Sequence, residues 1–540
     1  MQKKYESFGV MLDFSRNGVM TLPAIKRFLT TIRKMGYDTV FLYMEDTYEV
    51  EGEPYFGYMR SKYSIAEMKE IDEFCSSIDM EAIPCIQTLA HLRTFLKWDQ
   101  VPFDCDDILL ADNERTYQLI ENMFKTLSAC FKTKRLHIGM DEAHMLGKGR
   151  YFHEHGYVPS GEIIKKHLHK ICEIAKPYGY DLLVWSDMFM RTWNGGTYYV
   201  KEVKKVPDEV IESMPENVFP VYWDYFHKDE EAYDCMLKTH KQFHSETWFA
   251  GGICGWTGFT PHNQLSIIKS CEAIKACRKN NIKNLFFTMW GDDGMESSHF
   301  SLLPALCYVS EYAHGNCDEG KIKAKFKRIV GMEYDDFIKV DLPDLINPDE
   351  FMSRENPSKY MLYADPFLGF TDYTVPNGSN EFYKAKAGEL YAVANKTRKY
   401  GYIFNTLAAL CDVLSIKSEL GVKTRAIYKN GDKAELMRLA KEDYTLLNKK
   451  IQALHKALSK QWHNDNKPSG FEIQDARLGG LKQRILTCKA RLIEYAEGKL
   501  DKIEELDVEI LKFGTKENGH PIAFPCYGKI VTSNQFTHGM

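Results

Sequence analysis

Short apolar runs alternate with amphipathic helical patterns from residue 7 to about residue 290. The runs recur roughly every 30 to 50 residues, which is the spacing of successive strand and helix units in an α/β fold. The predicted strands are Phe8–Phe14, Thr39–Tyr43, Ala82–Gln87, Arg135–Gly139, Asp181–Trp185, Val218–Trp223, Phe249–Gly255 and Asn284–Met289. The predicted helices between them include Leu22–Met35, Ile65–Ile78, Arg115–Phe131, Ile163–Lys176 and Leu265–Lys279. Units of this kind predict a parallel sheet that closes into a (β/α)8 TIM barrel.

The pattern changes after the predicted barrel. Residues 336–365 are rich in Asp and Pro, a composition typical of a linker. Beyond them, Leu, Ala, Lys and Glu recur at helical period and predict a bundle of helices. The helical segments are Glu381–Arg398, Phe404–Leu420, Lys433–Lys460 and Gly480–Gly498. We therefore expect a barrel over residues 1–335, a linker over 336–365, and an α-helical domain with a C-terminal tail over 366–540.

Two segments of the helical region interrupt its period: Trp462 to Pro468, and Arg477 with the Leu, Gly and Gly that follow it. Irregular sequence of this kind could form a docking loop or a homodimer contact. An interhelical turn packed on the barrel is the more economical interpretation. A homodimer therefore stays open as an alternative.

The composition indicates an ordinary globular protein. Hydrophobic residues make up 44% of the chain and charged residues 27%, and the formal net charge is only -5. Because acids and bases are nearly balanced and interspersed, we expect no nucleic-acid groove and no membrane-surface patch. A small molecule or a glycan fits better as the partner.

Targeting and redox features are weak throughout. Residues 1–14 are too short and too polar for the apolar region of a signal peptide, and no apolar run is long enough to span a bilayer. The 14 cysteines are scattered without a C-x-x-C pair that would indicate zinc or a redox centre. We expect reduced cysteines and a cytoplasmic location.

The predicted strand ends carry many acids and tryptophans. In a barrel of this kind the active site lies at the C-terminal ends of the strands. Those ends read Asp13-Phe-Ser-Arg16, Glu45-Asp46, Gln87-Thr-Leu-Ala-His91, His137-Ile-Gly-Met-Asp141-Glu142, Trp185-Ser-Asp187, Tyr222-Trp-Asp224, Gly255-Trp256 and Trp290-Gly-Asp292. Residues two apart on a strand share a face, so several of these acids are expected to point into one cavity.

A single tryptophan at a strand end is usually a core or rim residue. Here half of the strand ends carry one, in a chain with only 8 tryptophans, and packing alone does not explain that concentration. Sugar rings present C–H faces for stacking and hydroxyl edges for hydrogen bonds to carboxylates. The combination favours a sugar-binding cavity.

The adjacent acids Asp141 and Glu142 are the clearest candidates for catalysis. Cleavage of a glycosidic bond needs one protonated carboxyl and one anionic group. Two neighbouring acids in a partly desolvated cavity repel each other, so one of them can stay protonated near neutrality. A capping pair at the start of a helix is the alternative, and the spacing from His137 and Gly139 disfavours it.

The sequence His137-Ile-Gly-Met-Asp141-Glu142 resembles the H-x-G-x-D-E signature of glycoside hydrolase family 20, the β-N-acetylhexosaminidases. Tyr222 and Asp224 match its Y-x-D pair, and Trp290 and Asp292 match its W-x-E pair with Asp in place of Glu. Further residues of the resemblance are Arg16, which would grip the ring hydroxyls, His91, the active-site histidine, and Trp185 and Trp256 of the acetamide pocket. With His137 and Asp187, these form the predicted substrate-binding set.

The resemblance covers roughly residues 7–300 and is closest to a short intracellular branch of the family, in which a helical domain follows the barrel. Most members carry an α/β domain before the barrel, whereas the first strand here begins close to residue 7. The replacement of Glu by Asp292 shortens a side chain that binds a hydroxyl and bears on the choice between GlcNAc and GalNAc.

The resemblance implies an exo-acting, retaining and substrate-assisted hydrolysis of terminal β-linked GlcNAc or GalNAc. The acetamido oxygen of the substrate would attack the anomeric carbon and form an oxazolinium. Glu142 would protonate the leaving oxygen and later deprotonate water. Asp141 would orient the acetamide, and Tyr222 would hydrogen-bond its oxygen. No metal and no cofactor is implied.

Two alternatives remain. His91, His137 and several aspartates could serve a metal-dependent barrel hydrolase, but the first strand lacks the H-x-H common in such sites, and activity that survives a chelator would dispose of this alternative. The chain could also be a non-catalytic sugar-binding barrel. Retention of both Asp141 and Glu142 argues against that alternative.

Overall fold

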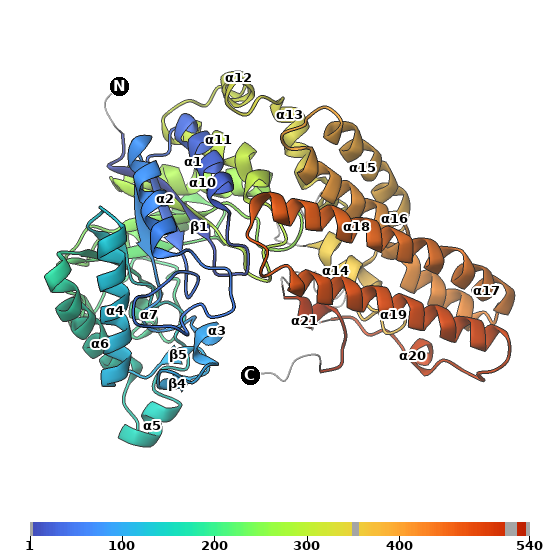
Figure 1. The fold of residues 1–540 in the computed structure, drawn as a ribbon, viewed down its shortest axis with the longest axis horizontal. Helices are drawn as coiled ribbons and strands as arrows, with labels where there is room; N and C mark the ends of the chain where they lie inside the picture. Colours follow the sequence, from blue (N-terminus) through green and yellow to red (C-terminus); the bar gives the residue numbers. More distant parts are fainter. Residues whose placement is uncertain (1–3, 348–355, 514–525, 536–540) are drawn as a thin grey trace. The chain divides into compact units, whose positions relative to one another are not determined.

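The computed structural model describes residues 4–347, 356–513 and 526–535 (Figure 1). The chain divides into two compact units. The first, here called the barrel unit, comprises Met1–Ile253, Ser266–Trp290 and Ala305–Lys325. The second, the helical unit, comprises Cys254–Leu265, Gly291–Pro304 and Phe326–Met540. The segments that follow the last two barrel strands thus belong to the helical unit.

The predicted (β/α)8 barrel is confirmed. Within the described residues, the strands close in the order β1-β10-β9-β8-β7-β6-β3-β2, and all neighbours in this barrel run parallel. The barrel strands are β1 (Ser7–Asp13), β2 (Thr39–Tyr43), β3 (Glu81–Cys85), β6 (Arg135–His137), β7 (Asp181–Trp185), β8 (Val218–Trp223), β9 (Trp248–Gly252) and β10 (Asn284–Met289). The predicted strands match these closely, but β3, β6 and β9 end two or three residues earlier, so residues expected on strands lie in loops.

Helices follow the barrel strands, and five of the main ones lie where helices are predicted. The main ones are α1 (Leu22–Met35), α2 (Ile65–Ser77), α4 (Glu114–Cys130), α6 (Ser160–Ala175), α9 (Glu230–His240), α10 (Asn263–Lys279) and α11 (Leu303–Ala313). Their starts follow capping chemistry: Thr21 accepts from the Ala24 N–H, and Ser64 and Glu67 form a capping box. The short hairpin β4 (Phe103–Cys105) and β5 (Ile108–Leu109) after β3 was not predicted.

Aromatic side chains from several strands fill the barrel interior. The ring of Phe41 on β2 lies 4.1 Å from that of Phe286 on β10 and 6.0 Å from that of Trp248 on β9, measured between centroids. His137 on β6 and Trp185 on β7 lie 4.4 Å apart. All five are buried. This layer fixes the strand ends because a close-packed interior leaves little room for adjustment.

The helical unit contains a bundle of long helices (Figure 1). These are α15 (Ser379–Ala394), α16 (Gly401–Lys429), α17 (Lys433–Lys441), α18 (Asp443–Asp465) and α19 (Glu472–Ala496). The predicted helix Lys433–Lys460 is divided at Glu442. The expectation that Arg477 and the two glycines after it interrupt a helix is wrong, because these residues lie inside α19.

The segment expected as a linker contains helical turns where it is described. These are η3 (Ile338–Asp344) and α14 (Pro357–Tyr363), whereas residues 348–355 lie outside the described part. The buried Asp341 accepts hydrogen bonds from the Asn263 amide at 2.8 Å and the Gln264 N–H at 3.0 Å. In this segment Asp accepts hydrogen bonds in buried positions and Pro begins a helix. Composition alone does not distinguish these roles from those that Asp and Pro have in a linker.

No helix among the described residues has the length and apolar character that crossing a membrane requires. Each of the cysteines is a free thiol.

Removing one ring of the interior layer should destabilise the barrel unit. Phe286→Ala should lower the free energy of unfolding by about 3–5 kcal/mol, since it deletes a buried ring and leaves a cavity. Urea denaturation followed by tryptophan fluorescence measures the change. Phe152→Ala, at a position 46% exposed, is the matched control and should cost less than about 1 kcal/mol. Equal effects of the two substitutions would show that the interior layer is not a main source of stability.

Candidate active site

The predicted site residues are divided between the two units. The barrel unit holds Arg16, His91, His137, Asp141, Glu142, Trp185, Asp187, Tyr222, Asp224 and Trp290, and the helical unit holds Trp256 and Asp292. Within the barrel unit, the Glu142 side chain is 44% exposed, that of Arg16 33%, that of His91 18% and that of Asp141 13%. His137, Trp185, Asp187, Tyr222 and Asp224 are almost fully buried. The more exposed group includes both acids.

Asp141 and Glu142 stand on a turn with unusual backbone angles directly after β6. Gly139, Met140 and Glu142 have φ values of +73°, +72° and +50°, in the left-handed region. A Cβ on Gly139 would lie 2.1 Å from the Gln87 Oε1 atom, so only glycine fits there. Non-glycine residues in this region are strained, and such strain concentrates at functional sites. Steric crowding therefore explains why the H-x-G-x-D-E pattern has glycine at this position.

His137 supports this turn from below. Its Nδ1 atom accepts a hydrogen bond from the Gly139 N–H at 3.1 Å, and its ring packs on Trp185. Burial lowers the pKa of His137 to about 3, so the ring is neutral. Because His137 is 0% exposed, it supports the turn and offers no surface to a ligand.

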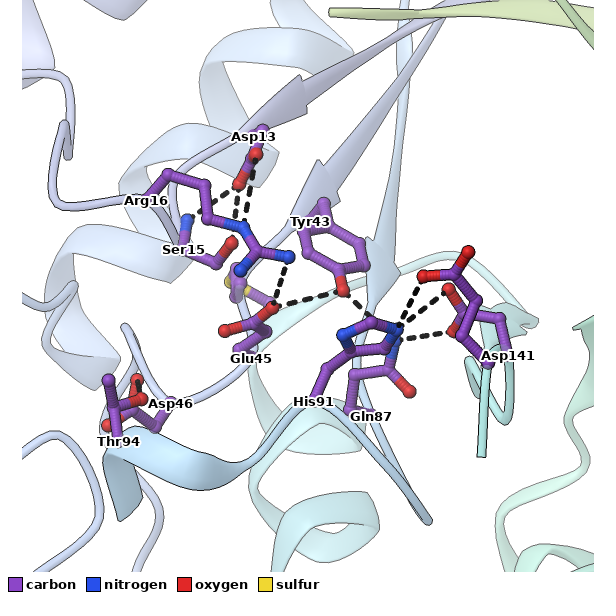
Figure 2. A network of polar contacts seen from close by, with 12 residues as sticks. Asp13, Ser15, Arg16, Tyr43, Glu45, Asp46, Gln87, His91, Thr94 and Asp141 are labelled. Carbon is purple, nitrogen blue, oxygen red and sulfur yellow. Dashed lines mark hydrogen bonds and ion pairs between the residues drawn. The ribbon is translucent and has the colours of Figure 1, made fainter. Parts of the chain in front are cut away.

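Asp141 is held by two partners. Its Oδ1 atom accepts a hydrogen bond from the Gln87 amide at 2.7 Å, and its Oδ2 atom lies 3.2 Å from the Nε2 atom of His91 (Figure 2). The same His91 atom lies 3.8 Å from the Glu142 carboxylate. His91 therefore faces both acids.

The network extends from Asp141 to the first two strands (Figure 2). Gln87 also donates to the Tyr43 hydroxyl at 3.0 Å, and Tyr43 donates to Glu45 at 3.2 Å. Glu45 in turn lies 3.3 Å from the Arg16 guanidinium. Gln87 and Glu45 stand at strand ends but are not among the predicted site residues, because an uncharged amide gives no catalytic signal and Glu45 matches no motif.

The charges of this network are fixed by ion pairing. Burial opposes protonation of His91, but its ion pair with Asp141 outweighs burial and raises the pKa of His91 to about 9. Burial tends to raise the pKa of Asp141, but the His91 charge and the Gln87 hydrogen bond outweigh it, so the pKa of Asp141 is lowered. Near neutral pH, Asp141 is an anion beside an imidazolium.

A third acid, Asp187, lies behind the pair. It begins α7 (Asp187–Arg191), and its Oδ2 atom accepts a hydrogen bond from the Glu142 N–H at 3.0 Å. Burial, and then the charge of Asp141, raise the pKa of Asp187 to about 7. The site therefore combines an ionised Asp141 with a buried carboxyl whose pKa is raised.

Tyrosines stand at the end of β8, which is separated from β6 by β7 alone. Tyr222 donates its hydroxyl proton to Asp224 at 2.6 Å, and Asp224 also accepts from the His227 ring at 2.6 Å. Tyr225, which sequence reasoning missed, is half-buried, and its hydroxyl shares hydrogen bonds with Thr288 and Trp290. Burial raises the pKa of Tyr225, the two hydrogen bonds lower it, and the charges of the acid pair raise it further. Its hydroxyl is thus electrostatically coupled to the acids.

One group among the described residues could hold a cation by geometry. His91, Asp141 and Glu142 each offer a ligand atom, and these atoms lie within 4.8 Å of one another. In the absence of a cation the ion pair with Asp141 raises the pKa of His91 to about 9, so a metal would have to displace a proton from this imidazole.

The strand ends of this barrel bring together two adjacent acids, a buried third acid and aromatic rings. These are the groups that hydrolysis of a glycosidic bond requires. A family profile described as the Glycoside Hydrolase 20C C-terminal domain matches residues 335–523. Hexosaminidase D of Homo sapiens is 23% identical over 329 residues, which cover 56% of this chain and 64% of that protein. Hexosaminidase D of Bos taurus is 22% identical over 329 residues, covering 57% of this chain and 90% of that protein. The C-terminal part of the chain is thus similar to a domain of glycoside hydrolase family 20, and the chain resembles Hexosaminidase D.

Solved structures also align with the chain. The GH20 exo beta-N-acetylglucosaminidase of Vibrio harveyi has a TM-score of 0.46 and 13% identity over 62% of this chain and 58% of that one. The chitobiase of Flavobacterium johnsoniae has a TM-score of 0.47 and 13% identity over 85% of this chain and 78% of that one.

The His91 ion pair should make stability depend on pH. The folded-state pKa of His91, about 9, lies above its ordinary value of 6.5. The stabilisation is therefore fully present below pH 6.5 and is lost as the pH rises through about 9. We expect the difference in unfolding free energy between the unchanged chain and His91→Gln to shrink across that window, as measured by urea denaturation.

The control for this experiment is His155→Gln, since the His155 side chain is 43% exposed and lies 3.9 Å from Glu154. An exposed pair contributes little, so this difference should stay near zero at each pH. A His91→Gln difference that is equally flat would contradict the assignment of an imidazolium at the site.

Proposed function

We propose that the chain is an exo-acting β-N-acetylhexosaminidase that releases terminal β-linked GlcNAc, GalNAc or both by a retaining, substrate-assisted mechanism. The observation that carries the proposal is the unequal state of the adjacent acids. Asp141 is buried, paired with His91 and ionised, whereas the neighbouring Glu142 side chain is 44% exposed and faces the same histidine. Glycosidic cleavage needs this combination of a proton donor beside a fixed anion.

In this mechanism Glu142 donates a proton to the leaving oxygen and later removes one from water. Because the Glu142 side chain is exposed, it can reach the leaving group of a substrate, which a buried acid cannot. Asp141 orients the acetamide and stabilises the positive charge that develops on its nitrogen. The substrate's acetamido oxygen attacks the anomeric carbon, the bond to the leaving oxygen breaks, and water then opens the oxazolinium.

The remaining substrate contacts rest on the resemblance to the family. Arg16, held by Glu45, would grip the ring hydroxyls, and Trp290 would line the pocket with its half-buried indole. Trp256 and Asp292 would bind the acetamide and a hydroxyl, and these two assignments stay predictions. The shorter Asp292 side chain is consistent with a site that accepts both GlcNAc and GalNAc.

We assign the hydrogen bond to the acetamide oxygen to Tyr225, although the family pattern points to Tyr222. A tyrosine hydroxyl has one proton, and that of Tyr222 is already donated to Asp224 in a fully buried position. Tyr225 is half-buried, and its hydroxyl lies within electrostatic range of both acids. Because Tyr222 is fully buried and Tyr225 is not, Tyr225 is the more accessible of the two hydroxyls.

A cytoplasmic location and a homodimer stay predictions from the sequence. Free thiols throughout the chain are consistent with a reducing compartment.

Release of para-nitrophenol from its β-GlcNAc glycoside tests the activity, and substitutions of the acids test their roles. Glu142→Gln should lower kcat/KM for an alkyl β-GlcNAc glycoside by about 100-fold or more, because that leaving group needs a proton. The loss with the aryl glycoside should be smaller. Asp141→Asn should be poor with both. Equal losses on both glycosides for Glu142→Gln would contradict its role as the acid.

The tyrosine assignment is tested by a matched pair of substitutions. Tyr225→Phe should lower kcat for the aryl glycoside by about 100-fold, since it removes one donor to developing charge. Tyr222→Phe should cost less than about tenfold, because Asp224 keeps its other donors. Steady-state kinetics decide between the two, and the reverse order of effects would return the role to Tyr222.

A further inference from the structure

The turn that carries the acid pair is held in a conformation that its sequence does not favour. Met140 and Glu142 have positive φ values although neither is glycine. Non-glycine residues in this region of backbone space are strained and persist only where surrounding contacts hold them. The side chains that supply those contacts therefore decide where the two carboxyls stand.

Gln87 fixes the first part of the turn. Its Oε1 atom accepts a hydrogen bond from the Met140 N–H at 3.1 Å, and its Nε2 atom donates to Asp141 at 2.7 Å. The amide is 0% exposed and packs where a Cβ on Gly139 would stand. One side chain thus binds both the backbone of the turn and the carboxylate that the turn presents.

Asp187 fixes the second part. Its Oδ2 atom accepts from the N–H of Glu142 itself, and its side chain is 0% exposed. Its other oxygen, Oδ1, is buried with no hydrogen-bond partner, although carboxylates with all their bonds made are the rule in protein interiors. The charged groups near Asp187 are Asp141, Glu142 and Arg191, whose guanidinium Nε atom lies 3.8 Å away, and the phenol of Tyr198 is also coupled to it. An incompletely satisfied acid at this position is difficult to explain by stability alone.

We propose that Gln87 and Asp187 are positioning residues that clamp the two ends of the turn, so that Gln87 sets the place of the Asp141 carboxylate and Asp187 sets that of the Glu142 carboxyl. Asp187 acts through the backbone of Glu142 and does not touch the substrate. The inference rests on the proposed function, because the clamp matters only if Glu142 transfers a proton. It replaces the expectation from sequence that Asp187 binds substrate.

The clamp makes a distinctive kinetic prediction for Asp187. Asp187→Leu removes the acceptor for the Glu142 N–H, and it should lower kcat for the alkyl glycoside by about 10- to 100-fold, as expected for loss of one hydrogen bond to a positioned group. The aryl glycoside, which needs less protonation, should lose clearly less. KM should change little, because no contact with the substrate is removed.

Asp187→Asn keeps an acceptor oxygen for the Glu142 N–H and should recover most of the activity that Asp187→Leu loses. For Gln87, the variant Gln87→Glu keeps the acceptor for Met140 and loses the donor to Asp141. It should therefore fold and yet be impaired with both glycosides, as Asp141→Asn is.

A double-substitution cycle separates positioning from general destabilisation. If Asp187 acts through Glu142, adding Asp187→Leu to Glu142→Gln should cause no further loss on the alkyl glycoside. Asp72→Asn is the matched control: this buried acid accepts from the Lys132 N–H at 3.3 Å. It should leave the ratio of alkyl to aryl rates unchanged even if it lowers the melting temperature.

Equal losses on both glycosides for Asp187→Leu, or losses that add fully to those of Glu142→Gln, would overturn the clamp while leaving the proposed function intact. A large rise in KM for Asp187→Leu would instead return Asp187 to the substrate-binding set. Absence of hydrolysis by the unchanged chain would overturn the proposed function and the clamp together.

Discussion

The hydrogen bond from Gln87 to Asp141, together with the ion pair from His91, is the constraint on which the rest of the site depends. It keeps one of two adjacent acids ionised in a position where burial would otherwise favour its protonated form. The neighbouring Glu142 then differs from Asp141 in exposure and in partners, although the two are adjacent in the sequence. A general acid and a fixed anion can arise from adjacent residues only if the fold treats them unequally.

The different environments of Asp141 and Glu142 depend on a locally strained backbone. The turn from Gly139 to Glu142 visits the left-handed region repeatedly, and contacts from Gln87 in the loop after β3, from β6 and from α7 help to hold it there. The aromatic layer below, built around Phe41 and Phe286, gives those strands fixed positions. Stability in the barrel interior thus maintains a strained arrangement at the barrel mouth.

The helical unit has its own buried polar anchor. Lys359 on α14 lies 2.6 Å from Glu296, and both side chains are 1% exposed. Arg477 on α19 lies 3.1 Å from Glu296 and 2.8 Å from Asp293. Removing one partner of such a group typically costs about 3–5 kcal/mol. Within this unit, the cluster ties the 291–304 segment to two helices, and it explains why Arg477 keeps its place in a regular helix despite the glycines that follow.

The positions of the barrel strands and of most helices follow from the sequence alone. Alternating apolar runs gave the barrel strands and their order along the chain, and the position of Asp141 and Glu142 just beyond a strand end identified them as candidates, since both signals are local. Tertiary structure decided the partners of those acids. Gln87 lies 54 positions from Asp141, and Asp187 lies 45 from Glu142. Pairings over such distances depend on strand register and turn geometry, and these follow from packing that no single stretch of sequence encodes.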